Sequence, residues 1–131
     1  MESMLKKKLI EYFSAQPMVA LAYFFGSRAR GDAGPMSDYD FAIYAVGEAT
    51  ARERDELRLT TIVALGKIIG TDAIDVVMLN DCYALELKYQ IIAQGELLFE
   101  REPYQVVVEP RILNEYFDFK YMLRKYHLTK S

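Results

Sequence analysis

The feature that most constrains the fold is an unbroken apolar and aromatic run from Met18 to Phe25, which ends at Gly26. A run of this kind is typical of a strand buried in the core of a domain. Before it, residues 3–15 place apolar side chains at helical spacing, and Pro17 ends this predicted helix. The chain therefore opens with a helix that leads into a buried strand.

The rest of the chain alternates strand and helix patterns. Further strands are predicted at residues 40–46, 74–79 and 96–100, and further helices at residues 50–69, 81–94 and 111–127. Thr50 and Glu53 fit a capping box, Asp81 is predicted to cap the next helix, and Pro110 is expected to precede the last. This order indicates one α/β domain with a small mixed sheet backed by helices and a C-terminal helical tail.

Composition narrows the class of protein. The 131 residues suit a single globular domain, with 52% hydrophobic and 27% charged residues. A net charge of −3 does not favour a nucleic-acid partner. The chain has one cysteine and one histidine, which excludes an internal disulfide and the usual zinc sites. We expect Cys82 to pack at the start of a helix and His127 to be exposed to solvent. Neither a signal peptide nor a membrane span is recognisable, and we expect a cytoplasmic protein.

Residues 26–40, GSRARGDAGPMSDYD, have the composition of a phosphate-binding loop. Gly26 permits close approach of an anion, and Ser27 is expected to start a short helical turn whose N–H groups point outward. Arg28 or Arg30 would add positive charge, and we favour Arg30 because it lies nearer the second glycine. A solvated surface loop is the alternative interpretation.

Acidic residues on two predicted strands indicate a site for divalent cations. Asp38 and Asp40 are two residues apart, so in a strand their carboxylates point to the same face and repel each other unless a cation lies between them. Asp75 opens another apolar strand and would join them if the strands are neighbours; Asp72 is the alternative acid. Three carboxylates can hold two Mg²⁺ ions, with Asp75 also near enough to act as a general base.

Taken together, these residues resemble the nucleotidyltransferase superfamily related to DNA polymerase beta. The shared pattern is Gly26-Ser27, a spacer over residues 28–37, Asp38-Tyr39-Asp40, and the later Asp75, and the resemblance spans residues 19–79. Within the superfamily, the small chain and its motif residues, GSRARG followed by SDYDFAI, resemble the minimal nucleotidyltransferases (MNT). These are antitoxins that are paired with a HEPN-domain toxin.

This resemblance implies an enzyme that transfers AMP from ATP to a tyrosine of the toxin. By motif position Gly26 and Ser27 would bind the triphosphate, and Arg30, favoured above for its place in the loop, would join them. Asp38 and Asp40 would bind metal, with Asp75 as third ligand and base. Residues 1–102 would be the nucleotidyltransferase domain and residues 103–131 a partner-docking tail.

The resemblance leaves the acceptor open. Larger relatives carry an additional C-terminal domain that binds the acceptor, whereas only residues 101–131 follow the last predicted strand here. We therefore expect a hetero-oligomer with the toxin, a homodimer being possible. A small-molecule acceptor and a non-catalytic antitoxin that acts by binding remain alternatives. Four tail tyrosines are expected to pack or to form an interface, with self-modification left open: Tyr104, Tyr116, Tyr121 and Tyr126.

Overall fold

The computed structural model describes residues 1–126, so the prediction for His127 lies outside the described residues. The elements, in chain order, are α1 (Ser3–Ser14), β1 (Val19–Phe25), α2 (Ser27–Arg30), β2 (Tyr39–Ala45), α3 (Ala51–Ile69), β3 (Ile74–Met78), the 3₁₀ helix η1 (Leu79–Asp81), α4 (Leu85–Gln94), β4 (Glu96–Glu100) and α5 (Tyr104–Lys125).

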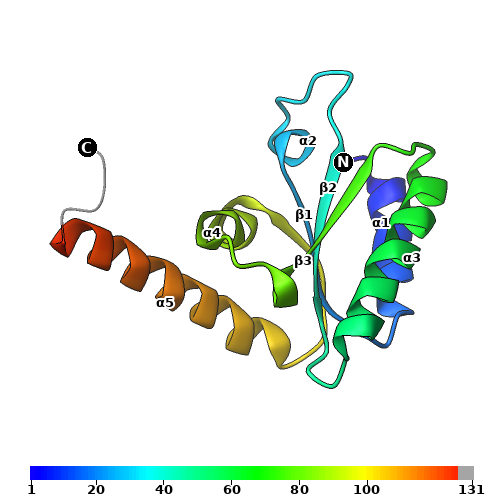
Figure 1. Cartoon of the computed structure of the whole chain (residues 1–131). Coiled ribbons are helices and arrows are strands. Elements are labelled where there is room, and N and C mark those ends of the chain that lie inside the picture. The colour runs from blue at the N-terminus through cyan, green and yellow to red at the C-terminus, as the bar shows by residue number, and fades with distance from the viewer. Residues whose placement is uncertain (127–131) are drawn as a thin grey trace.

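The four strands form one mixed sheet in the order β3-β2-β1-β4. β1 runs antiparallel to both of its neighbours, whereas β2 and β3 are parallel and are joined by α3. Helices α1 and α3 lie on one side of the sheet, and α4 and α5 lie on the other (Figure 1). The predicted α/β class with a small mixed sheet is confirmed.

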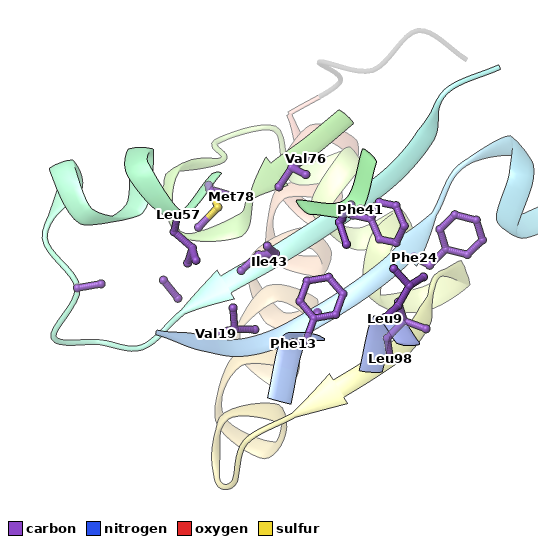
Figure 2. Close-up of a cluster of buried hydrophobic side chains, with 14 residues drawn as sticks. Leu9, Phe13, Val19, Phe24, Phe41, Ile43, Leu57, Val76, Met78 and Leu98 are labelled. Carbon is purple, nitrogen blue, oxygen red and sulfur yellow. The ribbon is translucent and has the colours of Figure 1, made fainter. Parts of the chain in front are cut away.

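The first side of the sheet carries the larger core cluster (Figure 2). Phe41 and Ile43 of β2 are fully buried there, against Leu9 and Phe13 of α1 and Leu65 of α3. Burying side chains of this size contributes about 1.5–3 kcal/mol each relative to exposure. This cluster fixes the position of β2 between its neighbours.

The second side holds a smaller cluster. Ala42 alternates with Phe41 along β2, and it packs in this cluster with Ile91 of α4 and with Val108 and Ile112 of α5. Because successive strand residues point to opposite faces, every second residue of β2 points toward α4 and α5. This alternation decides on which side the acidic side chains of β2 lie.

Helix α3 begins and ends as the sequence predicts. The Thr50 side chain accepts a hydrogen bond from the Glu53 N–H, and the Glu53 carboxylate accepts one from the Thr50 N–H, which completes the capping box. Gly70 follows in the left-handed conformation with φ 86°, which a glycine adopts without steric cost. Together they fix the length of the helix that connects β2 to β3.

The predicted cap of α4 is wrong. Asp81 ends η1 and does not cap α4, which begins at Leu85 after Ala84 without a side-chain cap. The Asp81 carboxylate instead accepts two hydrogen bonds from the Arg54 guanidinium, at 2.9 and 2.8 Å. This bidentate pair with α3 satisfies the acid, and it joins residues far apart in the sequence.

The predicted start of the last helix is also wrong. Pro110 lies inside α5, which begins at Tyr104, six residues earlier. Proline cannot donate to the carbonyl of Val106, but Val106 is 74% exposed and Pro110 is exposed as well, so the missing hydrogen bond lies on the side of the helix that faces water. The first half of α5 is held to β1 by the hydrogen bond that Tyr23 donates to Glu109. In residues 1–126, no helix is long and apolar enough to cross a membrane.

Burial of the first half of α5 leads to a stability prediction. Replacing Ile112, 4% exposed, with alanine should lower the free energy of unfolding by about 2–4 kcal/mol, because it leaves a cavity in the second cluster. The matched change Val106→Ala on the exposed side should cost less than about 0.5 kcal/mol. Urea unfolding of both variants measures this. Equal small losses would mean that α5 does not belong to the folded core.

Candidate functional site

Asp40 and Asp75 lie opposite each other on neighbouring strands. The parallel register of β2 and β3 pairs their Cα positions directly. Asp40 alternates with Phe41, and Asp75 with Val76, both of which belong to the cluster beneath α1 and α3. Both carboxylates therefore point to the other side of the sheet, toward α4 and α5. Asp72, the alternative acid, is exposed in the turn that precedes β3.

The acidic pair costs free energy in the folded chain. Partial burial raises the pKa of Asp40, and the charges of Asp75 and Asp38 raise it further, while Arg30 lowers it. Like charges that are brought together in this way favour a proton or a cation between them. The site therefore has the electrostatic character of a cation-binding site.

Gly26 makes room for the Asp40 carboxylate. It follows β1 with φ 85°, a conformation that L side chains rarely adopt, and a methyl group at its Cα would overlap the Asp40 side chain. The motif predicts a role for Gly26 toward phosphate alone, and this contact with Asp40 was not predicted. The contact follows from the register between β1 and β2, which pairs Phe25 with Asp40. The motif alone does not reveal this register.

Asp38 differs from expectation in its surroundings. Asp38 is exposed and directly precedes β2, whereas the predicted same-face arrangement of Asp38 and Asp40 required both residues to lie in a strand. Over the described chain, no group of three or more His, Cys, Asp or Glu side chains is arranged to hold a metal ion. Mg²⁺ nevertheless commonly uses one or two carboxylates and completes its shell with water and substrate phosphates. A paired Asp40 and Asp75 with Asp38 beside them fits that donor set.

The two arginines of α2 have different surroundings. Arg28 donates from Nε to the Ser37 carbonyl at 2.9 Å, and its guanidinium carbon lies 4.3 Å from the centre of the Tyr39 ring. Arg30 is exposed, lies 3.4 Å from Asp32, and is near enough to Asp40 to lower its pKa. Arg30 is thus the arginine on the side of the acids. Its predicted contact with phosphate remains a prediction.

The second half of α5 and the residue that follows it carry exposed aromatic and apolar side chains on more than one side of the helix, here called the tail surface. Its exposed side chains are Phe117, Phe119, Tyr121, Met122 and Tyr126. Beside it, a pocket of about 360 Å³ between α4 and α5 is lined by Tyr89, Tyr116, Phe117, Lys120 and Arg124. This half of the helix extends away from the sheet (Figure 1).

The tail tyrosines divide into two groups. The Tyr104 hydroxyl accepts a hydrogen bond from the Gly47 N–H at 3.1 Å, and Tyr116 stacks on Tyr89 with ring centres 4.0 Å apart. These two residues pack within the fold. Tyr121 and Tyr126 are exposed and belong to the tail surface.

The sequence matches the family described as Polymerase beta, Nucleotidyltransferase over residues 7–104. That range contains every candidate site residue, the whole sheet and most of its helices. No curated protein matches the chain.

Several solved structures with a similar fold are of toxin–antitoxin pairs. One is a mutant of the pair MntA and HepT, with TM-score 0.70, 21% identity, and coverage of 92% of this chain and 94% of that one. Another is a toxin–antitoxin structure with AMP-PNP, with TM-score 0.68, 22% identity and coverage of 96% and 95%. A third is a tri-AMPylated Shewanella oneidensis HEPN toxin in complex with its MNT antitoxin, with TM-score 0.67, 21% identity and coverage of 96% and 95%. At these identities the likeness concerns the fold.

The electrostatics of Asp40 lead to a prediction. Its pKa is raised in the folded state, so its ionised form destabilises the fold, and this penalty grows as the pH rises through the folded pKa. Asp40→Asn should therefore raise the melting temperature of the metal-free chain at pH 7, by on the order of 2 °C, and the gain should shrink as the pH falls toward 4. Thermal unfolding in EDTA measures it, with Asp72→Asn as control. A gain that is independent of pH would contradict this account.

Proposed function

Because this chain belongs to the polymerase beta nucleotidyltransferase family, we propose that it is an Mg²⁺-dependent antitoxin that transfers AMP from ATP to a tyrosine of a HEPN-type toxin. The observation that carries the proposal is the register that sets Asp40 against Asp75, next to the turn at Gly26. The shared fold with an MNT antitoxin crystallised with an AMPylated HEPN toxin supports this choice of nucleotide and acceptor.

In the proposed reaction, the tyrosine oxygen forms a bond to the α-phosphorus of ATP, and the bond to pyrophosphate breaks. The proton of the tyrosine hydroxyl passes to Asp75 as general base. Gly26, Ser27 and Arg30 bind the triphosphate. Two Mg²⁺ ions, held by the three carboxylates, would neutralise charge on the phosphates and on the leaving pyrophosphate. Most of the rate gain then comes from positioning the acceptor and from charge stabilisation.

The tail surface is the proposed docking site for the toxin. Phe117 and Tyr121, 54% and 56% exposed, lie four residues apart and so share one face of α5. Exposed aromatic side chains in a cluster are typical of protein interfaces. Helix α5 lies on the side of the sheet toward which Asp40 points, so a toxin docked on it would be on the same side of the sheet as the carboxylates.

The first prediction of the proposal concerns transfer itself. The purified HEPN partner, mixed with this chain, Mg²⁺ and each of the four NTPs in turn, should gain the mass of one or more AMP groups with ATP. The variant Asp38→Asn with Asp40→Asn should lose transfer by at least about 10³-fold, because the charge on the phosphates is then not neutralised. Intact-protein mass spectrometry measures both.

The same experiment separates the alternative functions. A stable complex with no added mass, and with equal protection from the toxin by the Asp38→Asn, Asp40→Asn variant, would indicate an antitoxin that acts by binding alone. Mass gain on a small acceptor in the absence of any partner would indicate a small-molecule transferase.

The second prediction concerns docking. Phe117→Ala with Tyr121→Ala should weaken the complex with the toxin by about 10- to 100-fold, because two interface aromatics are removed. Val106→Ala with Val107→Ala, at exposed positions in the first half of α5, should have little effect. Calorimetric titration of the toxin measures both. Unchanged affinity in the aromatic variant would place the interface elsewhere.

A further inference from the structure

The Arg28 side chain contacts the residues on either side of Asp38. Its Nε donates to the carbonyl of Ser37, which precedes Asp38, at 2.9 Å. Its guanidinium carbon lies 4.3 Å from the ring centre of Tyr39, which follows Asp38. One rigid, planar group therefore holds the backbone before the acid and the ring after it.

This contact is anchored in the core. The Tyr39 ring stacks on Phe24 of β1, with ring centres 6.3 Å apart and planes at 26°. Phe24 is 3% exposed and belongs to the cluster beneath α1 and α3. Arg28 thus ties the end of an exposed loop, at Ser37, to a rigid part of the sheet.

Arg28 also lies away from the acidic face. Tyr39 packs against the first core cluster and alternates with Asp40, so the two side chains point to opposite sides of β2. Within α2, Arg28 and Arg30 are two residues apart and so point in nearly opposite directions, at about 100° per residue.

We propose that Arg28 is a positioning residue that fixes the Asp38 carboxylate beside Asp40, and that it takes no part in binding the triphosphate. The role of Asp38 toward metal rests on the proposed function; the contacts of Arg28 do not. Residues that orient metal ligands without touching the metal typically affect metal affinity by 10- to 100-fold. Arg28 acts in this way, through Asp38 alone.

A double-mutant cycle tests this role. Mn²⁺ affinity, measured by electron paramagnetic resonance on the nucleotide-free chain, should fall about 10-fold in Arg28→Lys, which keeps the charge but loses the planar fork. In an Asp38→Asn background, Arg28→Lys should cause no further loss, because the carboxylate it orients is gone. Arg52→Lys, on the exposed surface of α3, is the matched control and should change nothing. An equal loss in both backgrounds, or no loss in either, would overturn the proposal.

A second measurement does not depend on metal or on transfer. Hydrogen exchange at the amides of residues 37–39 should accelerate in Arg28→Lys and in Tyr39→Leu, while Tyr39→Phe, which keeps the ring, should behave as wild type. Unchanged exchange in Arg28→Lys would overturn the proposal even if the chain proved not to transfer AMP or bind Mn²⁺. If Arg28→Lys failed to fold, Tyr39→Leu would decide the same point.

Transfer kinetics distinguish positioning from substrate binding. Arg28→Lys should lower kcat and leave KM for ATP unchanged at saturating Mg²⁺. A raised KM for ATP with unchanged kcat would instead make Arg28 a phosphate ligand and refute its role through Asp38.

Discussion

The parallel pairing of β2 with β3 is the interaction on which the site depends. It sets Asp40 directly opposite Asp75, and burial together with the nearby charge of Asp75 raises the pKa of Asp40 in the folded chain. The hydrophobic cluster beneath α1 and α3 holds both strands in this register and offsets the cost. The stability of the core and the electrostatic cost of the site are thus contributed by opposite sides of the same strands.

The alternation along β2 separates two tasks. One side of the strand carries Tyr39, where Phe24 and Arg28 hold the loop end in place. The other side carries Asp40, whose carboxylate lies in the space that the missing side chain of Gly26 leaves. β2 therefore presents the Asp40 carboxylate on one side. On its other side it presents Tyr39, whose contact with Arg28 holds the backbone next to Asp38.

Local patterns explain which parts of this arrangement could be predicted. The apolar run of β1 and the capping box of α3 are short-range signals, and both predicted their elements correctly. Asp81 failed as a predicted cap because its partner, Arg54, lies on another helix. Pro110 failed as a predicted helix boundary because the exposed side of a helix tolerates the loss of the hydrogen bond that proline cannot make. The same limit hid the contact of Gly26 with Asp40 and the stacking of Arg28 on Tyr39, which exist only once β1, α2 and β2 come together.

The crossover through α3 has a consequence for the order of folding. Asp40 and Asp75 belong to strands that are adjacent in the sheet but separated in sequence by a helix of 19 residues. The antiparallel pair β1 and β2 joins nearby segments, whereas pairing β3 with β2 must close a longer connection, so we expect β3 to add later. Until then the chain has a sheet but no acidic pair. We therefore expect the repulsion between the two carboxylates to arise late in folding, when burial of the core side chains already offsets its cost.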